Sequence, residues 1–371
     1  MTARRPAQLA APLAAPLAAP LAALQIAWQR QHGRHGLPWV GSRDPYRVWL
    51  SEIMLQQTQV STVLGYYGRF LQRLPDVAAL AAAHQDDVLA LWSGLGYYSR
   101  ARNLHRCAQV VVQQHGGQFP GTSAALAGLP GIGRSTAAAI AAFCFDERCA
   151  ILDGNVKRVL TRALGFADDL AELRHERALW LKAEALLPKA PQMAAYTQSL
   201  MDLGASLCSR RRPACDACPL AGQCVARAEG RPEAYPVKTR KLKRGQRAHA
   251  LLWLDHGGSV WLVQRPQTGV WAGLWSLPEF ESVEALWAQA TGWPGEGRPL
   301  PAVQHALTHF DWTLLPCHWL LPAGLGLAPL RPVQAGLPAG RWVPRQQALA
   351  LGLPAPIRRL LEAGLPGRAD G

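Results

Sequence analysis

Apolar residues recur at steps of three and four through residues 24–224, and glycine or proline separates the segments. This period gives each segment one apolar stripe, so the whole stretch is predicted to be helical. The clearest predicted helical segments are 44–74, 76–91, 101–114, 135–145, 156–164 and 193–205.

After residue 247 the pattern changes to short apolar runs. Residues 251–254 and 260–263 flank His256-Gly257-Gly258, which predicts a β-hairpin. The predicted fold class is therefore a mainly α N-terminal part followed by a smaller α+β domain.

Both ends of the helical part are bounded by changes in composition. Three copies of Ala-Pro-Leu-Ala fill residues 11–22, and their prolines disfavour a membrane-spanning or amphipathic targeting helix. We therefore expect four parts: a disordered tail (1–23), a helical domain (24–230), a basic linker (231–247) and a C-terminal domain (248–371). The linker is expected to lie either free in solvent or along the phosphates of a nucleic acid. For the whole protein we expect a cytoplasmic, nucleoid-associated location.

Charge indicates the class of partner. The 371 residues carry a formal net charge of +14, and 49% of them are hydrophobic. A folded protein this basic often binds a polyanion, usually nucleic acid, although general solubility is the alternative.

The segment Leu129-Pro130-Gly131-Ile132-Gly133 joins two predicted helices. Gly131 and Gly133 permit a tight turn, and the amides that follow lie at a helix N-terminus, which attracts phosphate. With Arg134 and Ser135 next in sequence, the segment is typical of a helix-hairpin-helix that grips the DNA backbone.

Two carboxylates form a candidate catalytic pair. Asp153 precedes a helical segment and is expected to cap it, which would hold the carboxylate ionised. Glu52 lies among apolar helix neighbours, so its pKa is expected to rise. One protonated and one ionised carboxylate suit the cleavage of a glycosidic bond. A structural cap and a surface glutamate are the alternatives.

Four cysteines follow with the spacing C-x6-C-x2-C-x5-C: Cys208, Cys215, Cys218 and Cys224. Their thiolates can close around one metal centre, most plausibly a [4Fe–4S] cluster, with zinc as the alternative.

These motifs together resemble the MutY family of adenine DNA glycosylases, within the endonuclease III superfamily. The segments that carry the resemblance are 49–60, 94–104, the hairpin with Asp153, and the cysteine spacing. The resemblance implies hydrolysis of the N-glycosidic bond of adenine mispaired with 8-oxoguanine or guanine in duplex DNA. It thereby implies base excision repair that prevents G:C to T:A mutations.

The resemblance also assigns roles to residues. Glu52 would protonate adenine N7, Asp153 would stabilise the oxocarbenium ion, and Asn155 would orient the catalytic groups. Tyr97 would be the wedge that stacks beside the lesion, and the amides of Gln56 and Gln57 would probe it.

In the cysteine loop and the C-terminal domain the resemblance implies a [4Fe–4S] cluster and a Nudix-like domain that recognises 8-oxoguanine. The family's Phe-Ser-His reading loop falls at Leu307-Thr308-His309, where Thr308 and His309 keep the hydrogen-bonding groups. No Nudix box follows Gly273, so pyrophosphate hydrolysis is not expected. A monomer that contacts the replication clamp is implied, although no clamp-binding peptide is recognisable.

Position 135 separates two chemistries. Bifunctional relatives carry a lysine there for a Schiff base, and Ser135 cannot form one. We therefore expect a monofunctional glycosylase, against the alternatives of a bifunctional glycosylase/lyase or a non-catalytic iron–sulfur DNA-binding protein.

Overall fold

The computed structural model describes residues 18–239, 243–325, 330 and 333–365. Residues 1–17 of the predicted tail and 240–242 of the predicted linker lie outside the described residues. The chain forms two compact units: residues 1–56 with 113–241, and residues 57–112 with 242–371. The domain boundaries predicted from the sequence do not coincide with these units, and they stay predictions.

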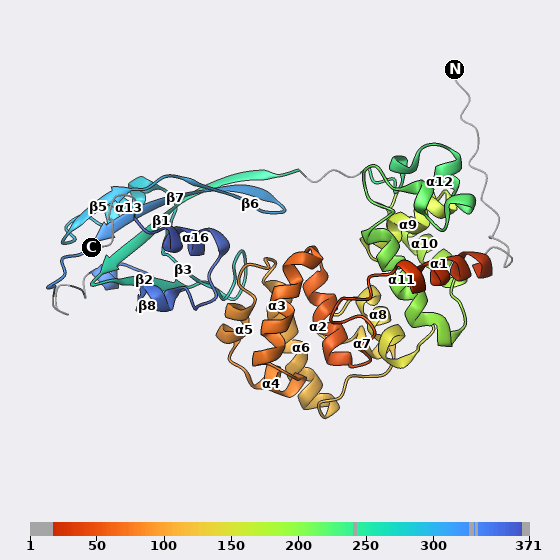
Figure 1. Ribbon diagram of the computed structural model, residues 1–371. Helices are drawn as coiled ribbons and strands as arrows, with labels where there is room; N and C mark the ends of the chain where they lie inside the picture. Colours follow the sequence, from red (N-terminus) through yellow and green to blue (C-terminus); the bar gives the residue numbers. More distant parts are fainter. Residues whose placement is uncertain (1–17, 240–242, 326–329, 331–332, 366–371) are drawn as a thin grey trace, which may run out of the picture. The chain divides into compact units, whose positions relative to one another are not determined.

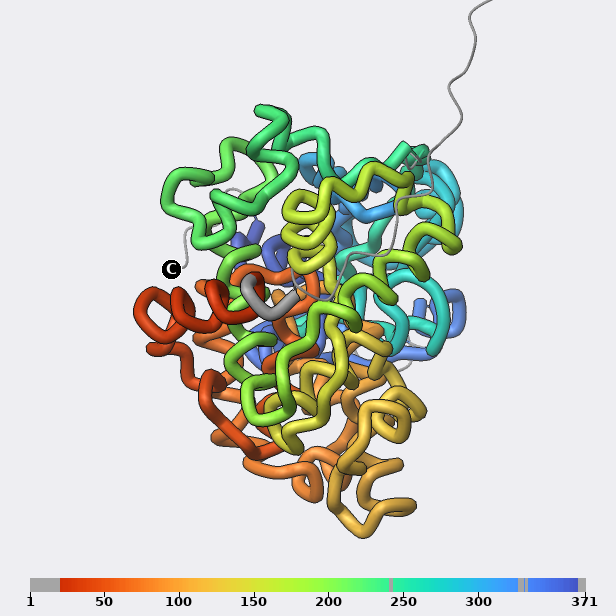
Figure 2. The backbone as a smooth tube through the Cα atoms, turned by 90° about the vertical axis from the view of Figure 1, so that its right-hand side faces the viewer, coloured from red at the N-terminus to blue at the C-terminus, as the bar shows by residue number. Residues whose placement is uncertain are grey.

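The first unit is helical (Figure 1). Its helices are α1 (Ala18–His32), α2 (Pro45–Leu55), α7 (Ser123–Leu126), α8 (Arg134–Phe145), α9 (Gly154–Leu164), α10 (Leu173–Ala185), α11 (Met193–Ala205) and α12 (Val225–Ala228). Buried side chains of α8 to α11 form its core, and α1 lies along α11 (Figure 2). Arg34, just after α1, donates to the fully buried Asp202 on α11 at 2.7 Å, which fixes this pairing.

The second unit combines helices with a mixed sheet (Figure 1). The helices are α3 (Val60–Arg73), α4 (Val77–Ala82), α5 (Gln85–Leu91), most of α6 (Ser99–His115), α13 (Val283–Gln289), α15 (Arg345–Ala348) and α16 (Ala355–Ala363). The strands are β1 (Gly245–His256), β2 (Ser259–Gln264), β3 (Trp275–Ser276), β4 (Glu279–Phe280), β5 (Glu296–Pro299), β6 (Val303–Ala306), β7 (Phe310–Leu320) and β8 (Gly340–Pro344).

Among the described residues the sheet has eight strands, with the central order β3-β2-β1-β7-β5. β4 pairs with β1, β6 with β7, and β8 with β2. The long strands β1 and β7 run parallel, from Gly245 opposite Phe310 onward, and the other pairs are antiparallel. The predicted hairpin is confirmed as β1–β2, where Gly257 and Gly258 supply the positive φ angles of its turn.

The predicted fold class, helical followed by α+β, is confirmed, and helix α11 has the predicted bounds. Two predicted segments are broken. Residues 44–74 form α2 and α3 because Gln57 between them has a φ of 58°, and 76–91 form α4 and α5 because Ala83 is extended. Helix α1 begins within the predicted tail, with Pro20 in its first turn, where a missing N–H costs little.

In the part of the chain that the structure describes, no helix is both long enough and apolar enough to cross a membrane.

Candidate functional site

Glu52 lies near the end of α2, a helix whose start the sequence specifies. Asp44 caps it by accepting from the Tyr46 amide at 2.9 Å, and Pro45 occupies the first turn. Trp49, Leu50, Ile53 and Met54 around Glu52 are buried, so α2 packs on most of its faces. Glu52 keeps some exposed surface, but the surrounding protein removes most of the water that would solvate a carboxylate.

Asp153 is the N-cap of α9, as predicted, and its carboxylate accepts from the Val156 amide at 2.7 Å. Burial nevertheless raises the pKa of Asp153, and the hydrogen bonds from the Val156 and Asn155 amides offset this only in part. Desolvation therefore opposes the expected effect of the cap on Asp153 and outweighs it.

The two carboxylates are electrostatically coupled. Burial, with a further contribution from the charge of Asp153, raises the pKa of Glu52 to about 8. Asp153 therefore loses its proton first, and its negative charge helps to keep Glu52 protonated. The predicted division into a proton donor and an ionised partner requires this order of ionisation, and it stays a prediction.

Arg158 orients the side chain of Asn155. The Arg158 guanidinium donates to Asn155 Oδ1 at 2.9 Å, to the Gly204 carbonyl at 2.6 Å and to the Cys208 carbonyl at 2.7 Å. A Cβ on Gly204 would lie 2.6 Å from Asn155 Cβ, so this close approach requires glycine. Arg158 therefore links the start of the cysteine loop to the first turn of α9, next to Asp153.

The predicted helix-hairpin-helix is present between α7 and α8. Gly131 has a φ of +76°, and Gly133 is the N-cap of α8, whose first amides donate to no capping side chain. Arg134 pairs with Glu184 at 2.5 Å and stacks on Trp180. Ser135 Oγ accepts from the Leu152 amide at 3.0 Å, so it holds the segment that leads into Asp153.

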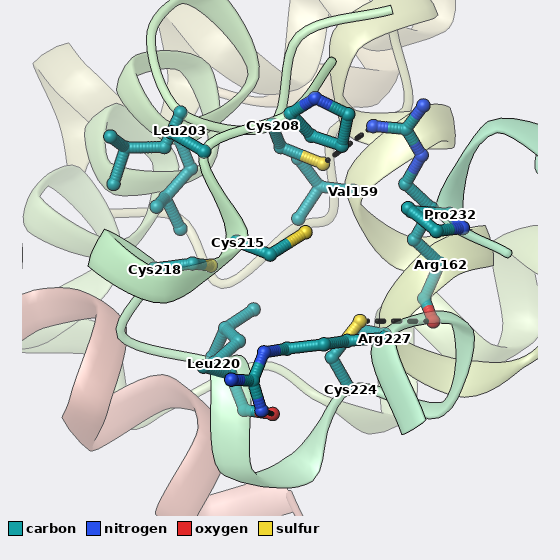
Figure 3. A pocket seen from close by; sticks show the side chains of 15 residues that line it. Val159, Arg162, Leu203, Cys208, Cys215, Cys218, Leu220, Cys224, Arg227 and Pro232 are labelled. Atoms are coloured by element: carbon teal, nitrogen blue, oxygen red, sulfur yellow. Dashed lines mark hydrogen bonds between the residues drawn. The ribbon is translucent and has the colours of Figure 1, made fainter. Parts of the chain in front are cut away.

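The four cysteines line one small cavity, and their sulfur atoms surround a common space (Figure 3). Burial, with contributions from the other three thiolates, raises the pKa of Cys218 to about 11. No three His, Cys, Asp or Glu side chains of the described residues converge to hold a metal ion.

Arg162 is the second arginine of α9 that holds this loop. Its buried guanidinium donates to Cys208 Sγ at 3.4 Å and to the carbonyl oxygens of Ser209, Arg210 and Tyr235. A buried guanidinium is costly without acceptors, and the Cys208 sulfur and these carbonyl oxygens supply them.

The second unit carries the residues predicted to read the lesion. Tyr97 is 47% exposed and has a φ of +47°, a conformation that a bulky residue adopts only when its surroundings enforce it. The buried Arg100 enforces it by donating to the carbonyls of Leu95 and Gly96 and packing against the Tyr97 ring. Trp92 Nε1 also donates to the Gly96 carbonyl at 3.2 Å.

Thr308 and His309 lie exposed in the turn between β6 and β7. Thr308 Oγ1 lies 3.4 Å from the Tyr97 hydroxyl, so the predicted wedge and the predicted reading loop meet in this unit. Gln57 is exposed, whereas Gln56 Nε2 bonds Thr136 Oγ1 at 3.4 Å in the first unit.

The structure thus gathers the predicted site residues into two sets. Glu52, Asp153, Asn155, the hairpin and the cysteines belong to the first unit, and Tyr97, Thr308 and His309 to the second. Sequence reasoning assigned no role to Arg158, Arg162 or Arg100. The four-residue spacing of Arg158 and Arg162 on one helix face was the one available signal.

Comparisons with known proteins bear on both parts of the chain. Residues 50–184 match the HhH-GPD superfamily of base excision DNA repair proteins, and residues 249–363 match the NUDIX domain. The "Adenine DNA glycosylase" of Buchnera aphidicola (subspecies Schizaphis graminum) is 32% identical over 91% of this chain and 97% of the relative. The "Adenine DNA glycosylase" of Homo sapiens is 32% identical over 87% of this chain and 70% of the relative.

A solved structure of a thermostable thymine-DNA glycosylase superposes with a TM-score of 0.51 at 26% identity. The match covers 57% of this chain and 97% of that chain.

Proposed function

Since the chain belongs to the adenine DNA glycosylase family, we propose that it removes adenine mispaired with 8-oxoguanine or guanine in duplex DNA. The observation that carries the proposal is the coupled pair, in which the charge of Asp153 helps to raise the pKa of Glu52 to about 8. The removal of this adenine would initiate base excision repair and prevent G:C to T:A mutations.

In the proposed mechanism the mispaired adenine leaves the base stack and enters the site of the first unit. Glu52 donates its proton to adenine N7, and the C1′–N9 bond breaks with its electron pair going to the base. The carboxylate of Asp153 stabilises the oxocarbenium ion, and water adds to C1′ and releases a proton. Asn155, held by Arg158, keeps Asp153 and the sugar aligned.

The chemistry is proposed to stop at base removal. Ser135 is engaged with the Leu152 amide and has no amine to attack C1′. Strand cleavage through a Schiff base is therefore not expected from this position.

The cysteine loop is proposed to hold a [4Fe–4S] cluster through Cys208, Cys215, Cys218 and Cys224. Such a cluster would order the loop, in which Arg210, Arg211 and Arg212 are exposed and available to phosphates. The amides at the start of α8 would bind a further phosphate.

The C-terminal domain is proposed to read 8-oxoguanine through Thr308 and His309, with Tyr97 as the wedge. We propose that the protein acts as a monomer. Contact with the replication clamp and location at the nucleoid remain proposals that rest on the family alone.

The decisive test uses an end-labelled duplex with one 8-oxoguanine:adenine pair, incubated with excess enzyme and split into samples with and without hot alkali. Cleavage at the adenine only after alkali is the expected result. Glu52→Gln should lower the rate at least about a thousandfold, because the base leaves without a proton, whereas the exposed control Glu281→Gln should leave it unchanged.

Cleavage without alkali would instead favour the bifunctional alternative. Binding of the duplex without any cleavage would favour a non-catalytic DNA-binding protein. An unaltered rate in Glu52→Gln would contradict the assignment of the proton donor.

A further inference from the structure

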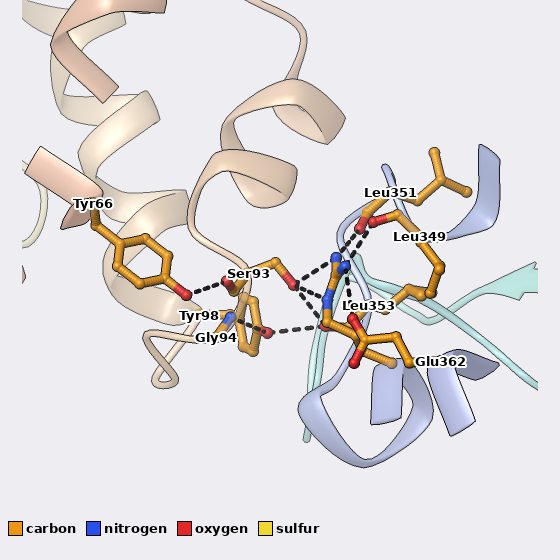
Figure 4. A network of polar contacts seen from close by, with 9 residues as sticks. Tyr66, Ser93, Gly94, Tyr98, Leu349, Leu351, Leu353 and Glu362 are labelled. Carbon is orange, nitrogen blue, oxygen red and sulfur yellow. Dashed lines mark hydrogen bonds and ion pairs between the residues drawn. The ribbon is translucent and has the colours of Figure 1, made fainter. Parts of the chain in front are cut away.

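The loop that carries Tyr97 is fastened at both ends to the C-terminal segment of the chain (Figure 4). At its start, Ser93 Oγ donates to the Leu353 carbonyl at 3.1 Å. At its end, the buried Tyr98 hydroxyl donates to the same carbonyl at 3.0 Å. Tyr66 of α3 adds a third bond, to the Ser93 carbonyl at 2.7 Å. One carbonyl oxygen near the start of α16 therefore fixes both ends of the loop.

Arg358 of α16 is the centre of this network. Its guanidinium donates to Ser93 Oγ from Nε at 3.2 Å and from Nη2 at 3.1 Å. It also donates to the carbonyls of Leu349 at 2.6 Å and Leu351 at 3.0 Å. A planar group with five donors suits several acceptors in fixed directions, which a lysine ammonium could not match.

The same segment packs closely against the helices of the unit. A Cβ on Gly352 would lie 3.0 Å from Leu89 Cβ on α5. Nearby, the Asp86 carboxylate accepts from Trp275 Nε1 and from Gln264 Nε2, each at 3.0 Å. These contacts keep the Leu353 carbonyl and Arg358 in place behind the Tyr97 loop.

Between its two fastened ends the loop has little freedom. Arg100 and Trp92 hold its carbonyls from within, and Tyr97 remains exposed at a positive φ with its hydroxyl 3.4 Å from Thr308 Oγ1. An aromatic ring that inserts into a base stack binds better when its backbone is already ordered, because less conformational entropy is lost.

We propose that Arg358 is a positioning residue for Tyr97, through which the C-terminal domain sets the shape of the loop that enters DNA. The proposal rests on the proposed function, because it takes Tyr97 as the group that inserts beside the lesion. The ligand class is duplex DNA carrying an 8-oxoguanine mispair. The C-terminal domain then contributes to lesion binding in two ways, through its own reading loop and through Arg358.

The test is a double-mutant cycle in binding. The probe is a duplex with 8-oxoguanine opposite 2′-fluoro-2′-deoxyadenosine, whose glycosidic bond resists hydrolysis. Arg358→Met should weaken binding about tenfold, and its exposed neighbour on the same helix, Arg359→Met, less than about twofold. In a Tyr97→Ala background, Arg358→Met should have no further effect, because the ring that it positions is already absent.

Two results would overturn the proposal: unchanged affinity in Arg358→Met, or losses that multiply with the loss in Tyr97→Ala. The second result would mean that Arg358 supports the fold independently of Tyr97. Should Arg358→Met fail to fold, Ser93→Ala removes one acceptor from the same network and enters the same cycle. The proposed function would fail differently, through no adenine release from a normal 8-oxoguanine:adenine duplex by the unaltered protein.

Discussion

The surroundings of Glu52, rather than its own chemistry, make it the candidate proton donor. Glu52 lies among buried side chains of α2 and near Asp153, so burial and a like charge both disfavour its ionised form. Asp153 lies at a helix N-terminus with two amides directed at it, so its negative charge is better tolerated. The two environments therefore suit the two carboxylates to the different roles that we propose for them.

This arrangement has a cost in stability that depends on pH. Between its ordinary value of 4.5 and about 8, Glu52 is protonated in the native state and ionised in the unfolded state. The native state then binds more protons, so the free energy of unfolding falls as pH rises through this range. At pH 7 the cost is about 3 kcal/mol. Glu52→Gln has no charge to bury, so its free energy of unfolding should not fall for this reason.

The measurement is thermal unfolding at pH 5 and pH 7.5. The midpoint of the unaltered protein should fall more between these values than that of Glu52→Gln, while Glu281→Gln should behave like the unaltered protein. Equal pH dependence in Glu52→Gln and the unaltered protein would show that the pKa of Glu52 is not raised.

Ser135 has a structural task at the start of α8. Ser135→Ala would leave the buried Leu152 amide without its acceptor, at a cost of about 1–3 kcal/mol. Because Leu152 precedes Asp153, the single-turnover excision rate should fall. Ser135→Thr, which keeps the hydroxyl, is the matched control, and a full rate in Ser135→Ala would refute this role.

At the scale of elements, α9 connects Asp153 and Asn155 to the cysteine loop. Asp153 caps the helix, Asn155 lies in its first turn, and Arg158 and Arg162 follow one turn apart on the side of the cysteines. One helix therefore connects the loop to the end that carries Asp153 and Asn155. Folding of the loop and alignment of the site should depend on each other.

Replacement of Arg162 tests this dependence. Arg162→Leu removes donors to two carbonyls of the cysteine loop, to the Tyr235 carbonyl and to Cys208 Sγ. If the loop holds the proposed cluster, the purified variant should contain less than about half the iron of the unaltered protein. The readouts are the number of iron atoms per protein molecule and the visible absorbance of the proposed cluster. Arg211→Leu, an exposed change in the same loop, should keep its iron. Full iron content in Arg162→Leu would contradict the role given to Arg162.

The N-termini of helices were among the features best predicted from the sequence. Asp44, Thr122 and Asp153 each cap the helix that they precede, because capping is a local interaction between a side chain and amides two or three residues away. The break at Gln57 was missed. The apolar period continues across it, and nothing local in the sequence requires the positive φ found there.

At the scale of the whole molecule, the charge of +14 predicts binding to DNA that weakens steeply with salt. Each phosphate contact contributes a slope of about −0.9 in a plot of log affinity against log salt. Arg210→Ala with Arg211→Ala, both exposed beside the cysteines, should weaken binding to matched and mismatched duplexes alike and reduce the slope by about 2.

The control is Arg174→Ala with Arg177→Ala on α10, which removes the same charge elsewhere. Fluorescence anisotropy between about 50 and 200 mM salt covers the useful range. An equal loss of slope in both double variants would show that net charge, rather than the cysteine loop, accounts for the effect.

The sequence by itself determined the features that depend on neighbours in the chain. The helical period, the caps, the glycine hairpin, the cysteine spacing and the serine at position 135 are all local, so the order of residues is enough to recognise each of them. The long motifs around Glu52 and Tyr97 identified the family. These features predict the kind of chemistry and the residues that perform it.

Only the tertiary structure decided how those residues are tuned and held. Burial of Asp153 outweighs its cap, Arg158 and Arg162 find their acceptors some fifty residues away, and Arg358 reaches Ser93 across 265 positions. Desolvation and long-range hydrogen bonds depend on which segments pack together, and that packing is set by the whole chain rather than by any stretch of it. The pKa of Glu52 and the conformation of Tyr97 are therefore properties of the fold.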